Sequence, residues 1–449
     1  MLIMKPSQVD KGGVEAWQSL VHVCRRWRNL VFESPRSLNL QLFCTPKTPA
    51  KDTLDVWPAL PLIVKGNMDV LSRTDNIIAA LGQINRVRQV ELFFELEDWH
   101  LDIILAPMHV SFPELTDLYL WSLGETRVIP DSFLGGSAPR LRSFNLVSIP
   151  FPGLPKLLLS ATQLVQLHLY NIPHSGYISP KAMVALLSVS SSLESLHLEF
   201  QSPQSRPGSE GRSLAQPERS ILPALHEFGF EGFTEYLEEL VTHIDTPRLD
   251  KMDITFSNET NFDCPRLAQF INCTPILRAL DEAHLEFKYQ FASVTLRYRT
   301  PKSVLNELRI KTSMMDPIWQ PSVVAAVVQL CKSSLPPLSI VEDLNINSQK
   351  FFLEIHTIES ALWLELLLPF TAVKNFYLSG EYAPDIAAAL QELAGDKIKE
   401  VLPRLQNIFV EGLEPSGPLQ ENIKQFVAAR QLLNHHITVS VGGKTPQAT

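Results

Sequence analysis

The stretch FPELTDLYL, residues 112–120, carries the pattern that decides the fold. Leu115, Leu118 and Leu120 stand at the first, fourth and sixth positions of a unit, and Tyr119 stands between the last two leucines. Successive side chains of a strand point to opposite faces, so a short strand here buries its leucines and turns Tyr119 outward. The stretch therefore predicts a half-buried strand with a polar outer face.

The same apolar-x-x-apolar-x-apolar pattern occurs twelve times along the chain, with starts 23 to 36 residues apart. Chance alternation would not hold such a register over so long a stretch. The pattern therefore indicates an internal repeat with a mean period of about 29 residues. The units begin at Val87, Leu115, Leu141, Leu164, Leu193, Leu225, Leu249, Leu277, Leu305, Val341, Val373 and Leu405.

Apolar-periodic stretches that are typical of helices lie between the units, as in SPKAMVALLSV (residues 179–189) and SVVAAVVQLC (residues 322–331). A single strand–helix unit cannot bury both of its apolar faces, whereas stacked neighbours can. The pattern is similar to that of leucine-rich repeats. We expect an α/β leucine-rich-repeat solenoid with irregular units, strands on its concave face and helices on its convex face.

Residues 37–441 are expected to form this solenoid, after a short helical segment at residues 1–36 and before a flexible tail at residues 442–449. One insertion interrupts the array. Residues 201–220 are rich in Ser, Pro, Gly and Gln and nearly free of apolar side chains. Such a segment cannot bury enough surface to offset its ordering entropy, so we expect a mobile loop there.

Composition excludes several classes of function. The chain of 449 residues has a net charge of −9, which argues against a dedicated nucleic-acid binder because such proteins need a basic surface. Its five cysteines form no CxxC pair, which indicates reduced thiols and no zinc ligand set. No stretch is long and apolar enough to cross a bilayer, and the start lacks a signal-peptide pattern. We expect an intracellular protein, cytoplasmic or nuclear, without cofactor, metal, membrane or nucleic-acid partner.

No GxSxG, HExxH, dinucleotide or kinase motif is present, so we expect no enzyme activity; a hydrolase or nucleotide-binding enzyme is the weakest alternative. In a solenoid, the outward strand positions select the partner. These positions form a mixed polar surface with a few aromatic side chains, which are typical interface anchors. The candidates for substrate contact are Tyr119, Asn145, His168, His197, Arg309, Tyr377 and Phe409.

A basic segment, VCRRWRNLVFESPRSLNLQL (residues 23–42), precedes the repeats. On a helical wheel its apolar side chains form one stripe with those just upstream, which predicts an amphipathic helix over residues 17–32. Pro35 ends the helix, and alternating leucines at 38, 40 and 42 begin the first strand. The stripe contains Trp17, Leu20, Val21, Cys24, Trp27 and Val31.

This helix followed by a long irregular repeat array resembles the fungal F-box proteins, whose F-box ends in a Val-Cys-x-x-Trp-type helix just before the repeats. The resemblance is to the second half of an F-box, because residues 1–17 lack the Leu-Pro segment and apolar helix that open one. It implies a substrate receptor of an SCF-type cullin–RING ubiquitin ligase, bound to the Skp-family adaptor and its cullin complex and holding a protein substrate that the sequence does not identify. The residues that carry over as adaptor-binding positions are Leu20, Val23, Cys24 and Trp27.

The alternative is a leucine-rich-repeat interaction scaffold without a ligase role. In that case residues 17–32 cover the first open apolar face of the array, since repeat arrays need such caps.

Overall fold

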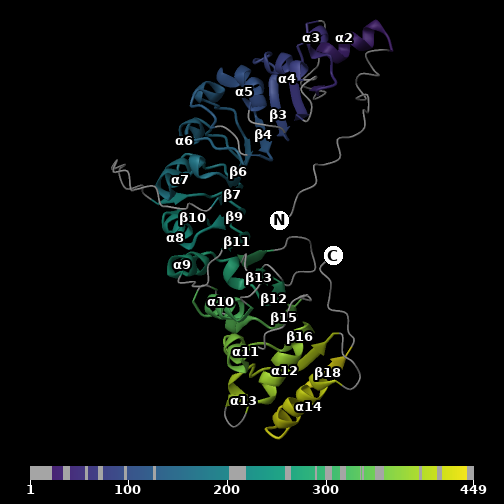
Figure 1. Cartoon of the computed structure of the whole chain (residues 1–449), viewed down its shortest axis with the longest axis vertical. Helices are drawn as coiled ribbons and strands as arrows, with labels where there is room; N and C mark the ends of the chain where they lie inside the picture. Colours follow the sequence, from purple (N-terminus) through teal and green to yellow (C-terminus); the bar gives the residue numbers. More distant parts are fainter. Residues whose placement is uncertain are drawn as a thin grey trace. The chain divides into compact units, whose positions relative to one another are not determined.

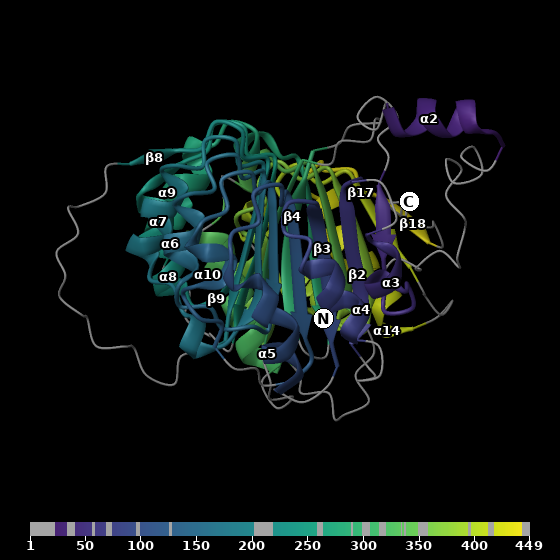
Figure 2. The same ribbon diagram turned by 90° about the horizontal axis from the view of Figure 1, so that it is seen from above.

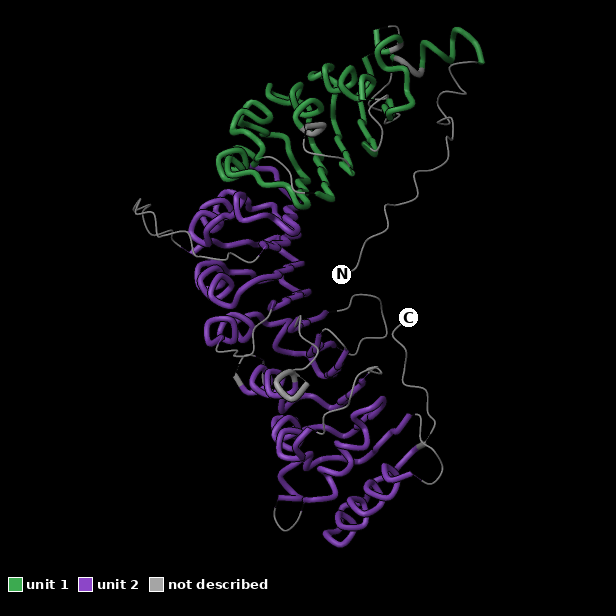
Figure 3. Tube along the Cα trace, viewed as in Figure 1, with its two compact units in different colours: residues 1–161 green, residues 162–449 purple. Residues whose placement is uncertain are grey.

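The computed structural model divides into two compact units, Met1–Ala161 and Thr162–Thr449 (Figure 3). The predicted boundary at residues 36 and 37, most of the predicted loop and the predicted tail lie outside the residues that the structure describes. The described residues are 23–33, 41–55, 59–68, 74–95, 99–124, 128–201, 219–257, 264–288, 291–298, 306–313, 320–333, 335, 338–348, 358–393, 397–411 and 417–441.

In its described residues the first unit contains five strands in the order of the chain, and neighbouring strands are parallel. Short helices connect the strands (Figure 1). The elements are α2 (Arg25–Glu33), β1 (Leu42–Cys44), α3 (Ala50–Thr53), β2 (Leu62–Met68), α4 (Thr74–Leu81), β3 (Val87–Phe94), α5 (Trp99–Leu105), η2 (Ala106–His109), β4 (Asp117–Ser122), η3 (Phe133–Gly136), β5 (Ser143–Val147) and α6 (Leu154–Leu158).

The stretch that decides the fold behaves as predicted. Leu118 and Leu120 in β4 are buried, whereas Tyr119 between them is half-buried on the other face. Leu118 pairs with Phe144 in the neighbouring strand, so apolar side chains of successive repeats form a continuous buried row.

The part of the second unit that the structure describes has eleven strands in one sheet, in the order β6-β7-β9-β11-β14-β13-β12-β15-β16-β17-β18. The strands are β6 (Gln166–Ile172), β7 (Ser195–Phe200), β9 (Glu227–Gly232), β11 (Lys251–Ser257), β12 (Glu282–Lys288), β13 (Phe291–Arg297), β14 (Glu307–Ser313), β15 (Asp343–Ser348), β16 (Asn375–Gly380), β17 (Asn407–Val410) and β18 (Thr438–Val441), with a separate pair of β8 (Ser220–Ile221) and β10 (Ile244–Asp245).

Helices follow most of these strands, and α7, α8 and α9 lie together on one side of the sheet (Figures 1 and 2). Helix α7 begins at Pro180, which suits a first helical position, and the Ser179 hydroxyl accepts a hydrogen bond from the Ala182 amide. The helical elements of this unit are η4 (His174–Gly176), α7 (Pro180–Leu187), α8 (Thr234–Thr242), α9 (Pro265–Cys273), η5 (Leu277–Ala279), α10 (Gln320–Ser333), η6 (Leu338–Ile340), α11 (Ser360–Leu367), α12 (Ala383–Gln391), α13 (Lys397–Glu400) and α14 (Pro418–Gln431).

The alternation of strands and helices is confirmed, as is a mostly parallel α/β sheet. The prediction that all strands follow one another in the sheet in the order of the chain is wrong at one place. Strands β12, β13 and β14 form an antiparallel meander, so β14 pairs with β11 while β12 pairs with β15. The predicted unit start at Leu277 belongs to η5, and the strand begins at Glu282. A short connection between β12 and β13 leaves no length for a helix, so the chain reverses direction.

Two strands of the main sheet were missed. Strand β2 begins with the continuous apolar run Leu62, Ile63 and Val64, which shows no alternation of apolar and polar side chains. Strand β13 has the 1-4-6 spacing at Phe291, Val294 and Leu296, but it begins 14 residues after the unit start at Leu277, closer than the 23 to 36 residues that separate the predicted units. Strand β13 is also buried on both faces, so Ser293 and Thr295 take buried positions where the pattern leads one to expect exposed side chains.

Candidate interaction surface

The strands of the second unit carry a row of polar side chains on the face that points away from the apolar core. Parallel register places equivalent positions of successive repeats side by side, such as Ser195 beside Glu227 and Glu227 beside Lys251. We call this surface the polar strand face. It consists of Gln166, His168 and Tyr170 on β6; Ser195, His197 and Glu199 on β7; Glu227, Gly229 and Glu231 on β9; Lys251, Asp253 and Thr255 on β11; and Glu307, Arg309 and Lys311 on β14.

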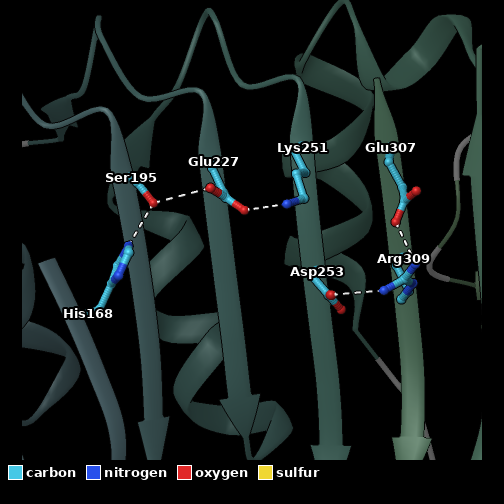
Figure 4. A network of polar contacts seen from close by, with 7 residues as sticks. All are labelled: His168, Ser195, Glu227, Lys251, Asp253, Glu307 and Arg309. Atoms are coloured by element: carbon cyan, nitrogen blue, oxygen red, sulfur yellow. Dashed lines mark hydrogen bonds and ion pairs between the residues drawn. The ribbon is translucent and has the colours of Figure 1, made fainter. Parts of the chain in front are cut away.

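A hydrogen-bonded ladder crosses the first four of these strands (Figure 4). The distance from His168 Nε2 to Ser195 Oγ is 2.8 Å, Ser195 Oγ lies 3.4 Å from Glu227 Oε2, and Lys251 Nζ donates to Glu227 Oε1 at 2.5 Å. Burial alone would raise the pKa of Glu227, but the hydrogen bond and charge of Lys251 outweigh burial and lower it. The carboxylate therefore stays ionised and fixes the ladder at its centre.

The direction of these hydrogen bonds determines whether Ser195 is arranged as a nucleophile. The single Ser195 proton goes to Glu227, because an ionised carboxylate can only accept. His168 must then donate from Nε2, and burial lowers the pKa of His168, which favours the neutral ring with its proton on that atom. A nucleophilic serine needs the opposite arrangement, in which the imidazole accepts the hydroxyl proton. The ladder has the bonding of a structural network.

A second network occupies β11, β13 and β14. Glu307 Oε2 lies 2.9 Å from Arg297 Nε, and Glu307 Oε1 lies 2.9 Å from Arg309 Nη2. Arg309 also reaches Asp253 at 3.4 Å (Figure 4). The Glu307 side chain is 9% exposed, so two guanidinium groups offset the charge of one nearly buried carboxylate.

His197 lies on β7 beside the first network, between His168 on β6 and Gly229 on β9. Its ring contacts that of Tyr170 in a tilted arrangement, with centroids 4.2 Å apart and an interplanar angle of 33°. Burial first, and then the neighbouring His168, lower the pKa of His197 to about 4, so the ring is neutral at physiological pH. A Cβ placed on Gly229 in the next strand would lie 2.1 Å from His197 Nδ1. Glycine at this position therefore makes room for the imidazole.

At the other end of the sheet, the rings of Tyr377 and Phe409 stack with centroids 4.6 Å apart and an interplanar angle of 11°. An amide ladder runs beside them. Asn407 Nδ2 donates to Asn375 Oδ1 at 2.8 Å, and Asn375 Nδ2 donates to Asp343 Oδ1 at 2.6 Å. This part of the sheet presents stacked rings and side-chain amides, with the Asp343 carboxylate at one end of the amide ladder.

Two predicted contact residues belong to the first unit. The Tyr119 ring lies 5.4 Å from that of Phe93, and burial and then Glu91 raise the pKa of Tyr119. Asn145 Nδ2 donates to Ser143 Oγ within its own strand at 3.0 Å. Of the predicted contact residues, the structure thus gathers His168, His197 and Arg309 on one surface of the second unit.

The predicted adaptor-binding residues lie at or before helix α2. Val23, Cys24 and Trp27 are exposed. Leu20 lies outside the described residues. The predicted helix over residues 17–32 can be compared with the structure in its second half, where α2 spans Arg25–Glu33.

The residues that join the candidates to one another were not chosen as candidates. Ser195, Glu227 and Lys251 stand one outward position before the chosen column and belong to the predicted polar surface, whereas Glu199 and Glu231 stand one position after the column and were overlooked. Extending the alternation by two residues beyond the column would have found Glu199 and Glu231.

No family model and no curated protein matches this chain. None of the helices that the structure describes is long and apolar enough to cross a membrane. Within the same described residues, no group of three His, Cys, Asp or Glu side chains could hold a metal ion.

Proposed function

We propose that this chain is a leucine-rich-repeat substrate receptor of an SCF-type cullin–RING ubiquitin ligase. Helix α2 docks on the Skp-family adaptor, and the strand surface of the repeats holds a protein substrate. The chain itself performs no chemistry in this role. It increases the rate of transfer by holding the substrate close to the charged conjugating enzyme.

The exposure of α2 and the residues before it carries this proposal. Trp27 is 48% exposed and Leu30 55%, and their spacing of three residues places them on one face of α2, while Val23, which is 65% exposed, lies just before the helix. Covering one such side chain contributes roughly 1.5–3 kcal/mol, so leaving three in water is unfavourable unless a partner covers them.

Helix α2 also carries positively charged side chains. Arg25, Arg26 and Arg28 are exposed on the same short helix. Tryptophan and arginine are the side chains that most often dominate binding energy at protein interfaces. An apolar groove with an acidic rim would complement this helix.

The second candidate is an interaction scaffold without a ligase role, and the polar strand face favours it because that network involves no residue of α2. A scaffold in which residues 17–32 cap the array is less well supported. A cap would bury Val23, Trp27 and Leu30 against the repeats, whereas these side chains are exposed.

Binding of purified Skp-family adaptor to the full chain, measured by calorimetry, tests the proposal. We expect the wild type to bind and the double variant Val23→Ala/Trp27→Ala to lose at least about tenfold in affinity. Leu432→Ala is the matched control, because Leu432 is an apolar side chain that is 86% exposed far along the sequence. Circular dichroism should be unchanged in all variants, since each altered side chain is exposed. Absence of adaptor binding by the wild type would leave the scaffold as the better account.

A further inference from the structure

Two carboxylates on the polar strand face oppose each other directly. Glu199 on β7 is the registered partner of Glu231 on β9, so the two side chains leave adjacent strands at the same level of the sheet. Like charges in this position destabilise a sheet. Burial and then the nearby Glu231 raise the pKa of Glu199 to about 7, and burial also raises the pKa of Glu231.

The surrounding charges do not resolve this repulsion. On the outward positions of β7, β9 and β11 the only cation among four carboxylates is Lys251, which bonds Glu227. Asp253 has Arg309 as its partner. Within the described part of the chain, neither Glu199 nor Glu231 has an ion pair within 4 Å.

The charge of Lys311, two strands away from Glu231 on β14, reaches both carboxylates and opposes the rise of their pKa. Its ammonium lies 4.5 Å from the ring centroid of Phe291, on the β13 side of its strand. Lys311 therefore has a favourable contact of its own away from the carboxylates. The strands carrying Glu199 and Glu231 are left with an excess of negative charge on an outward face.

The neighbouring aromatic rings suit a planar cation. Tyr170 and His197 form a tilted pair of rings in contact beside Glu199, and His197 is neutral and so does not repel a positive charge. Arginine combines stacking on aromatic rings with a planar fork of donors that fits carboxylates. Phosphate-bearing partners would be repelled by the same surface.

We propose that the face of β7 and β9 around Glu199 and Glu231 is a docking surface for an extended protein segment that presents arginine side chains. Tyr170 and His197 form its aromatic wall. The proposal deepens the proposed function, since it rests on the strand surface holding a protein partner, but it does not depend on α2 or on the adaptor.

The test uses the full chain and a fluorescein-labelled octapeptide that alternates serine and arginine, because alternate residues of an extended peptide share one face. We expect binding in fluorescence anisotropy, and no binding of the peptide with glutamine in place of arginine. The double variant Glu199→Gln/Glu231→Gln should lose about tenfold or more in affinity. Its fold should be retained, because the substitution removes a repulsion.

A matched control separates this surface from general attraction to an acidic protein. Glu194→Gln/Glu392→Gln changes the net charge equally at two exposed positions outside the polar strand face, and should alter affinity less than about twofold. An equal loss in both double variants, or no binding by the wild type, would overturn the proposal. Adaptor binding is measured separately with the α2 variants, so failure here leaves that result unaffected.

Discussion

Two neighbouring parts of the polar strand face differ in whether their carboxylates are paired with cations. Glu307 is nearly buried and lies between the guanidinium groups of Arg297 and Arg309. Glu199 and Glu231 oppose each other, and no ion pair within 4 Å involves them among the described residues. The first arrangement stabilises the fold, whereas the second is unfavourable in the free chain and becomes favourable when a cation binds. The difference indicates which part of the surface serves structure and which serves recognition.

The largest effect is expected where the charges are paired. Glu307→Gln removes the charge that Arg297 and Arg309 share, so Arg297 loses the carboxylate at 2.9 Å and Arg309 keeps the more distant Asp253 at 3.4 Å. Breaking a buried ion pair is costly, so we expect the free energy of unfolding to fall by about 2–4 kcal/mol in urea denaturation. Glu392→Gln is the control and should change it by less than about 0.5 kcal/mol. Equal midpoints for the two variants would contradict a structural role for Glu307.

A smaller loss is expected from Gly229→Ala. The added methyl group would meet His197 Nδ1, and overpacking of this kind costs about 1–3 kcal/mol. A double-mutant cycle with His197→Ala sharpens the test, because removal of the imidazole also removes the clash. We expect Gly229→Ala to be nearly neutral in that background. If the losses of stability from the two substitutions were additive, the glycine would be needed for a reason other than the space that it leaves for His197.

The smallest effect is expected for the exposed pair of Lys251 and Glu227. Both side chains are about half exposed, at 48% and 47%, and surface ion pairs contribute about 0–1 kcal/mol. Lys251→Gln should lower stability by less than about 0.5 kcal/mol, and 1 M salt should remove the difference. A loss of stability as large as that caused by Glu307→Gln would mean that the Lys251–Glu227 pair stabilises the fold as much as the network around Glu307.

Sequence periodicity predicted the strands with a 1-4-6 pattern because one face of each strand is buried. Leu118 and Leu120 illustrate this, since their burial follows directly from the alternation. Strand β13 has the same spacing at Phe291, Val294 and Leu296 but was missed, because it follows the unit start at Leu277 too closely to be a further strand–helix repeat. The antiparallel order of β12, β13 and β14 depends on connection length, which apolar spacing does not encode.

The candidate surface was predicted in part. Alternation identified His168, His197 and Arg309 as outward residues, and the register of the sheet aligns them in one row. Their partners could not be inferred, because the opposition of Glu199 and Glu231 depends on the pairing of strands more than thirty residues apart in sequence. The excess of charge at one place therefore became evident once the register was known.

The pH dependence of arginine-peptide affinity tests the recognition role most directly. The carboxylate form of Glu199 binds the cation, and its pKa of about 7 means that it becomes protonated as the pH falls through neutrality. Glu231 has a raised pKa and reinforces this trend, Asp253 and Lys311 are its charged neighbours, and His197 stays neutral because its pKa is about 4.

We therefore expect the affinity of the wild type for the serine–arginine octapeptide to rise severalfold between about pH 6 and pH 8. The Glu199→Gln/Glu231→Gln variant should bind weakly and with little dependence on pH over the same range. A wild-type affinity that does not change with pH, or a double variant with the same profile as the wild type, would contradict the assignment of these two carboxylates to recognition.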